Sequence, residues 1–178
     1  FTEVNMDQNF KIVIPMAGYG SRMRPHTWVH PKPLLPLAGR TVLDYSLEQF
    51  KTLPGLKDAE YVFIISQNQG DQIQEYMAAA HPEMKVHFIL QSEMRGQAHA
   101  LWLARELLKG PMLMAFSDTL IVPDLAFIPG EGADAIAWVK PVEDPRRFGV
   151  IELDSQGWAT RLVEKPKETT NNLVLVGF

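Results

Sequence analysis

Residues 11–40 read KIVIPMAGYGSRMRPHTWVHPKPLLPLAGR. The first five, KIVIP, predict a short buried strand, because a run of β-branched apolar residues is followed directly by glycines. Gly18 and Gly20 allow the backbone to approach a ligand closely or to adopt a positive φ. We therefore expect a strand that ends in a glycine turn, as in parallel sheets that bind ligands beyond the carboxyl ends of their strands.

The same stretch carries a local excess of positive charge. No acidic residue occurs between Gln8 and Leu43, whereas this interval holds five cations: Lys11, Arg22, Arg24, Lys32 and Arg40. The backbone N–H groups of a glycine turn form a concavity for anions, and the basic side chains add full charges. Prolines at positions 25, 31, 33 and 36 stiffen the loop. A rigid basic loop at a strand end suits a polyphosphate.

Two common phosphate-binding motifs are absent. A dinucleotide fingerprint requires a third glycine at position 23, which is Met23, and Pro25 interrupts the helix that should begin there. No G-x-x-x-x-G-K-S/T stretch occurs in the chain. The sequence therefore argues against a Rossmann dehydrogenase and against a P-loop NTPase.

Strands and helices alternate up to residue 116. Apolar runs predict strands at 11–15, 61–65, 85–90 and 112–116, and periodic stretches predict helices at 41–51, 69–80 and 97–109. Thr41, with Asp44 three residues later, predicts a capped helix start. This rhythm indicates right-handed crossovers onto a mainly parallel sheet flanked by helices, an α/β fold.

The pattern becomes β-rich beyond Pro123. Strand-like segments at 135–139, 149–153, 159–163 and 173–176 are separated by loops that contain proline and glycine. We expect this region to decorate the same domain. Since a domain typically has about 100–200 residues, residues 1–178 should form a single one.

Composition excludes several classes of protein. Without cysteine the chain has no disulfide framework, thiolate metal site or cysteine nucleophile. Its 17 Lys and Arg against 21 Asp and Glu give a formal net charge of −4, so nothing attracts it overall to nucleic acid or anionic membrane. No apolar run reaches the ~18 residues of a membrane span, and the five histidines lack metal-ligand spacing. We expect a soluble, cytoplasmic protein.

Both halves of the basic loop resemble the signature of one family. The runs G-Y-G-S-R and P-K-P-L match the G-x-G-[TS]-R and P-K-[PA]-[LM] elements of sugar-phosphate nucleotidyltransferases. Further segments match in the family's order: Q-x-E-x-x-G-x-A-H-A from Gln91, Ser117-Asp118, D-P-x-x-F-G-V-I-E from Asp144, and E-K-P from Glu164. The resemblance spans nearly the whole chain.

The resemblance implies a Rossmann-like, three-layer fold of the GT-A type with β-rich sugar-binding insertions. It also implies the reaction NTP + sugar 1-phosphate → NDP-sugar + pyrophosphate. The nucleotide would be bound by the backbone at Ala17, Gly18, Gly20 and Gly96. Gln91 would read the base edge, for which its amide offers both a donor and an acceptor.

The remaining roles implied by the resemblance involve charge. Arg22, Lys32 and Lys165 would neutralise phosphates in catalysis, and Asp118 would hold Mg²⁺, as a hard oxygen ligand can. Gly149 and Glu164 would bind the sugar.

Two features depart from the family pattern. Ser117 stands where the family usually has glycine, and the family's second metal-binding acidic residue lies downstream of Phe178. The second departure predicts a catalytic domain truncated at its C-terminus, which can be inactive as it stands. Met6 is a plausible natural initiator, although Phe1 precedes it.

Two alternatives stay open. One is a non-catalytic regulatory subunit of the same superfamily, against which the retention of Arg22, Lys32 and Asp118 argues. The other is a nucleotidyltransferase that acts on a non-sugar phospho-alcohol, although the F-G-V and E-K elements favour a hexose phosphate. The segment from Gln91 favours uracil or thymine as the base. The sequence does not identify the sugar, and it leaves open whether the protein is a homo-oligomer.

Overall fold

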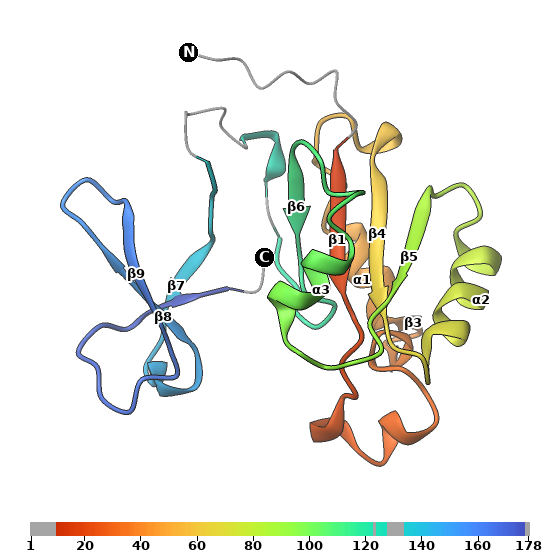
Figure 1. Cartoon of the computed structure of the whole chain (residues 1–178), viewed down its shortest axis with the longest axis horizontal. Coiled ribbons are helices and arrows are strands. Elements are labelled where there is room, and N and C mark those ends of the chain that lie inside the picture. Colours follow the sequence, from red (N-terminus) through yellow and green to blue (C-terminus); the bar gives the residue numbers. More distant parts are fainter. Residues whose placement is uncertain (1–9, 123, 128–133, 177–178) are drawn as a thin grey trace. The chain divides into compact units, whose positions relative to one another are not determined.

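The computed structural model describes residues 10–122, 124–127 and 134–176 (Figure 1). These residues divide into two compact units, one within residues 1–131 and the other within 132–178. The first unit is an α/β structure and the second is an antiparallel β-sheet. That the two units form one domain stays a prediction.

The first unit is built on a parallel sheet with the strand order β5-β4-β1-β6. The central strand β1 (Lys11–Pro15) pairs with β4 (Glu60–Ile65) on one side and with β6 (Met112–Met114) on the other, and β5 (Val86–Leu90) pairs with β4. The three middle residues of β1 are fully buried, as expected for a parallel strand covered on both faces.

Helices cover both faces of this sheet (Figure 1). α3 (Gln97–Leu103) packs through Ala100 against Val62 and its neighbours on one face. α1 (Val42–Glu48) lies on the other face, where the ring of Phe50, just beyond the helix, meets Tyr61 edge-on. α2 (Gly70–Ala80) is hydrogen-bonded to α1. The predicted three-layer α/β arrangement is therefore confirmed.

The second unit is an antiparallel sheet in the order β7-β10-β8-β9. Its strands are β7 (Val139–Pro141), β8 (Gly149–Leu153), β9 (Ala159–Glu164) and β10 (Leu173–Leu175). Val150, Ile151 and Val174 are its buried apolar residues. The β-rich character predicted for this part of the chain is confirmed.

Several predicted elements have other limits. α3 ends at Leu103 rather than at residue 109, because the following N–H groups bond to carbonyls three residues back, as Leu107 does to Ala104. β7 covers Val139–Pro141 instead of 135–139, since its register is set by pairing with β10. α1 ends at Glu48 and β6 at Met114, both earlier than predicted.

Short elements that the sequence did not suggest lie mainly in loops. A two-stranded hairpin joins β2 (Pro36–Leu37) to β3 (Arg40–Thr41). The 3-10 helices are η1 (Ser21–Met23), η2 (His26–Trp28), η3 (Lys32–Leu34), η4 (Leu56–Asp58), η5 (Leu125–Phe127) and η6 (Pro145–Arg147). Within the described ranges, no helix has both the length and the apolar character needed to cross a membrane.

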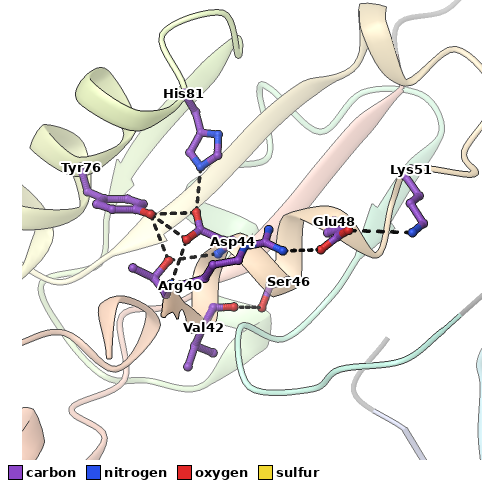
Figure 2. A network of polar contacts seen from close by, with 9 residues as sticks. Arg40, Val42, Asp44, Ser46, Glu48, Lys51, Tyr76 and His81 are labelled. Carbon is purple, nitrogen blue, oxygen red and sulfur yellow. Dashed lines mark hydrogen bonds and ion pairs between the residues drawn. The ribbon is translucent and has the colours of Figure 1, made fainter. Parts of the chain in front are cut away.

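Asp44 joins the start of α1 to α2 (Figure 2). The Thr41 hydroxyl accepts the Asp44 N–H at 3.1 Å, and the Asp44 carboxylate accepts the Thr41 N–H at 2.8 Å, which confirms the predicted cap. The same carboxylate accepts the Tyr76 hydroxyl at 2.8 Å and lies 2.9 Å from Nε2 of His81. Its side chain is only 11% exposed, so water competes little for these contacts.

This environment gives Asp44 an unusually acidic carboxyl group. Burial acts to raise the pKa of Asp44, but hydrogen bonds from His81, the Thr41 N–H and Tyr76 outweigh burial and lower the pKa from 3.8 to about 2. A carboxyl whose pKa is lower in the folded state stabilises the fold above its unfolded pKa, and that stabilisation is lost as the pH falls from about 4 through 2. At 1.36 kcal/mol per pKa unit it is on the order of 2 kcal/mol.

We predict that Asp44→Asn lowers the free energy of unfolding at pH 7 by on the order of 2 kcal/mol, because the ionised acceptor is lost. The difference from the unsubstituted protein should shrink between pH 4 and pH 2, as measured by urea unfolding. Asp58→Asn is the control, since Asp58 is exposed and its carboxylate makes no ion pair or hydrogen bond within the described residues. A difference that stays constant down to pH 2 would contradict the prediction.

Candidate functional site

A cavity of about 740 Å³ opens at the carboxyl ends of the strands in the first unit. Its walls come from the end of β1 and the loop that follows it (residues 16–35, the glycine loop), from the segment between β5 and α3, and from the segment that follows β6. Eight predicted site residues line it: Ala17, Gly18, Gly20, Arg22, Lys32, Gln91, Gly96 and Asp118. Residues predicted from separate motifs thus meet in one cavity.

The glycine loop has a compact conformation that depends on Gly20. This residue has a φ of 58°, and its carbonyl accepts the Thr27 hydroxyl at 2.9 Å. A Cβ at this position would lie 2.9 Å from the Thr27 methyl. Position 20 therefore requires glycine for two reasons, the positive φ and the lack of space for a Cβ. This is a stronger constraint than the sequence indicated, which was only that a glycine allows such a turn.

Two glutamines of the α2 region hold the same loop in place. Gln69 donates its side-chain amide to the Thr27 carbonyl at 3.1 Å, and Gln72 donates to the Val29 carbonyl at 3.1 Å. Neither glutamine belongs to a motif, so neither was predicted from the sequence. Only their helical spacing of three residues, which places both on one side of α2, could have indicated a shared partner.

The two cations of the cavity differ in their surroundings. Lys32 forms an ion pair with Asp118, with side-chain exposures of 26% and 46%. Arg22 makes no ion pair with any described residue and is exposed. The Lys32 ammonium is therefore already held beside the carboxylate at the end of β6, while the Arg22 guanidinium remains available to an anion.

The end of β6 is fixed from α1. The Ser46 hydroxyl donates to the Ser117 carbonyl at 3.1 Å, directly before Asp118 in the chain. Both serines are buried. Ser117, the departure from the family's glycine, thus has a defined backbone contact, and Asp118 lines the cavity.

Gln91 supplies a buried amide to the cavity. It is 5% exposed, and its backbone N–H extends the β4–β5 pairing by donating to the Ile65 carbonyl at 2.8 Å. Its side-chain nitrogen donates to the Gly96 carbonyl at 3.2 Å. This bond closes the turn that leads from β5 into α3, and it ties together two residues predicted to bind the nucleotide.

The other three predicted residues lie in the second unit. Gly149 of β8 is the cross-strand partner of Glu164 in β9. The next residue, Lys165, forms an ion pair with Glu164, with 2.6 Å between Nζ and Oε1. Lys165 has a φ of 45°, which is rare for a residue with a side chain, and its N–H donates to the Phe148 carbonyl at 2.9 Å. These residues form a polar group at one end of that sheet.

No ready-made metal centre is present within the part of the chain that the structure describes. It contains no cluster of three or more His, Cys, Asp or Glu side chains able to hold a metal. Asp118 is the carboxylate that lines the cavity.

Comparisons with known proteins agree with this arrangement. The family model described as "Nucleotidyl transferase" matches residues 11–178. A low-salt glycan biosynthesis nucleotidyltransferase, Agl11, from Haloferax volcanii is 33% identical, covering 94% of this chain and 48% of that protein. A glucose-1-phosphate thymidylyltransferase from Streptomyces griseus is 32% identical, again covering 94% and 48%. The chain thus spans about half the length of these relatives.

A solved structure shows the same fold. UDP-glucose pyrophosphorylase in complex with UDP-glucose superimposes with a TM-score of 0.79, covering 96% of this chain and 75% of that one at 20% identity. At this identity the likeness concerns the fold alone.

We predict that Gly20→Ala lowers the free energy of unfolding by about 1–3 kcal/mol, because alanine is strained at this φ and its methyl meets Thr27. Gly18→Ala is the matched control, since a Cβ there has nothing within 4 Å. Urea unfolding of both variants measures the difference. Equal stabilities would show that the loop conformation does not depend on Gly20.

Proposed function

Because the chain belongs to the nucleotidyl transferase family, we propose that it transfers a nucleoside monophosphate from an NTP to a sugar 1-phosphate and releases pyrophosphate. The observation that carries the proposal is the cavity itself. A glycine loop, the cations Arg22 and Lys32, the buried Gln91 amide and the Asp118 carboxylate line one cavity. These are the groups that a triphosphate, a base and a divalent cation require.

The proposed reaction needs no covalent nucleophile. A phosphate oxygen of the sugar 1-phosphate attacks the α-phosphorus of the NTP. The new P–O bond forms as the bond between that phosphorus and the oxygen bridging to the β-phosphate breaks, and the electron pair leaves with pyrophosphate. Both reactants are polyanions, so the barrier arises from charge repulsion and orientation. The chain would act by positioning the reactants and stabilising the developing charge.

The first unit would bind the nucleotide and neutralise the leaving group. Backbone N–H groups around Gly18 and Gly20 would contact phosphate oxygens, and Gln91 would contact the base edge. The planar Arg22 guanidinium can address two phosphate oxygens at once. Lys32, held beside the cavity by Asp118, would contact the same phosphates.

We assign Asp118 to Mg²⁺. This cation is commonly held by one or two carboxylates together with substrate phosphates, so a single carboxylate fits a metal that arrives with the nucleotide. When bound, Mg²⁺ supplies Lewis-acid stabilisation of the phosphoryl oxygens and a template for the reactants. Lys32 would then be released from its ion pair with Asp118 towards the phosphates.

We assign the binding of the sugar to residues of the second unit. Gly149 and Glu164, which are cross-strand partners, would contact the sugar hydroxyls, and Lys165 would neutralise the attacking phosphate. The left-handed backbone of Lys165 supports a functional role, because such conformations are concentrated at functional sites.

The proposal is tested by pyrophosphate release from a panel of five NTPs and several sugar 1-phosphates, with and without Mg²⁺. Activity with one or a few combinations is the expected result. Magnesium-dependent nucleotide binding without turnover would instead favour a non-catalytic member of the superfamily. Turnover with a phospho-alcohol alone would move the acceptor away from sugars. No binding and no release would overturn the proposal.

We predict that Arg22→Ala lowers the rate of pyrophosphate release by about 10²–10³-fold, because charge developing on the leaving group loses its partner. Arg22→Lys should recover only part of the rate, since an ammonium cannot form the planar two-oxygen contact. The control is Arg24→Ala, which removes an equal charge from the same loop outside the cavity wall. Equal rates for Arg22→Ala and Arg24→Ala would remove Arg22 from the mechanism.

We also predict that Asp118→Asn removes the magnesium dependence of nucleotide binding and lowers turnover by about 100-fold or more. Affinity for the metal-free nucleotide should not fall, because Lys32 loses its counter-ion and stays available. Calorimetric titration with and without Mg²⁺ measures both effects. Asp124→Asn, at an exposed carboxylate outside the cavity wall, is the control, and an unchanged magnesium dependence in Asp118→Asn would exclude Asp118 as the ligand.

A further inference from the structure

The Gln91 side chain has two partners, and both lie at its nitrogen. Nε2 is 3.2 Å from the Gly96 carbonyl oxygen and 3.4 Å from Nδ1 of His99. His99 belongs to α3, is half-buried and is not part of the cavity wall, whereas Gln91 lines the cavity. His99 can therefore affect the cavity through its contact with Gln91.

The chemistry of the partners fixes the orientation of the amide. A carbonyl oxygen can only accept a hydrogen bond, so the end of the amide that faces Gly96 must be the nitrogen. The amide nitrogen carries two hydrogens, and the second is accepted by Nδ1 of His99 when the ring proton is on Nε2. Both donors of Gln91 are then used within the chain.

The oxygen is the end of the amide that remains for a ligand. Within the described residues, Oε1 of Gln91 has no hydrogen-bond partner, and it is not among the buried polar atoms that lack one. Gln91 therefore offers the cavity an acceptor, although the residue type alone offers both a donor and an acceptor.

We propose that His99 is a positioning residue, which locks the Gln91 amide so that the nucleotide site presents an acceptor and selects bases with a ring N–H at that point. Uracil, thymine and guanine carry such a donor on their pairing edge, whereas cytosine and adenine place a ring-nitrogen lone pair there. The proposal rests on the proposed function, because it takes the cavity to be the nucleotide site.

The selection follows from the free-energy cost of placing a lone pair of the base opposite the acceptor Oε1 of Gln91. A lone pair opposed to Oε1 leaves both groups buried without a partner, and a site built around one hydrogen bond rejects a ligand that cannot make it. Without the acceptor on His99, one amide hydrogen is free, and the side chain can turn to offer a donor instead. The Gly96 carbonyl still favours the original orientation, so we expect the selectivity to fall by about tenfold rather than to vanish.

The test compares two nearly isosteric variants. Asn at position 99 can place a carbonyl oxygen near the position of the lost Nδ1, whereas Leu has a similar shape and no acceptor. Equilibrium dissociation constants for UTP, dTTP, GTP, CTP and ATP are measured for the unsubstituted protein, His99→Asn and His99→Leu. The expected result is a preference for UTP, dTTP or GTP over CTP and ATP, which is kept in His99→Asn and reduced about tenfold in His99→Leu. Urea unfolding of each variant separates this effect from a loss of folding.

A second measurement needs no nucleotide. ¹⁵N NMR of the histidine ring should show His99 with its proton on Nε2, and the Gln91 side-chain NH₂ hydrogens should exchange with water faster in His99→Leu than in His99→Asn. A proton on Nδ1, or selectivity that is equal in His99→Leu and the unsubstituted protein, would overturn the role of His99. A loss of selectivity in both variants would also overturn it, because shape rather than the acceptor would then matter. Failure of every NTP to bind would overturn the proposed function as well.

Discussion

The parallel pairing of β1 with β4 on one side and β6 on the other is the constraint on which the rest of the first unit depends. Parallel strands bring their carboxyl ends to one edge of a sheet, so that the segments after them must meet there. The glycine loop follows β1, the Gln91 segment follows β5, and Asp118 follows β6. A one-residue slip of β1 would turn its side chains to the opposite faces and break both layers of helix packing.

The charged side chains of the cavity differ in whether they have a counter-ion. The Lys32–Asp118 pair is nearly neutral as a whole, so it stabilises itself and holds both groups in place. The exposed Arg22, by contrast, has no counter-ion among the described residues and leaves a positive charge on the lining of the cavity. A chain with a formal net charge of −4 can therefore still carry a local positive charge at one place.

Features that depend on neighbouring residues were predictable from the sequence. The KIVIP strand, the positions of the glycines after it and the Thr41–Asp44 cap all follow from local pattern, and the structure has each of them.

Contacts between distant residues were not predictable in this way. Lys32 and Asp118 are 86 positions apart, and nothing local to either indicates their pairing. The end of α3 was missed for another reason, because apolar spacing continues to Leu108 while the backbone has already tightened at Ala104. The bond between Gln91 and His99 depends on the turn at Gly96, whose φ of 91° no pattern specifies.

The junction at Asp44 has a consequence for how a ligand enters. α2 holds the glycine loop through Gln69 and Gln72, α1 holds the end of β6 through Ser46, and Asp44 joins the two helices. Two walls of the cavity are therefore set by one connected scaffold. The conformational entropy of ordering these walls is lost when the protein folds and not when a ligand binds. A nucleotide would meet a preorganised recess, and its affinity would reflect the contacts it makes rather than the work of assembling the site.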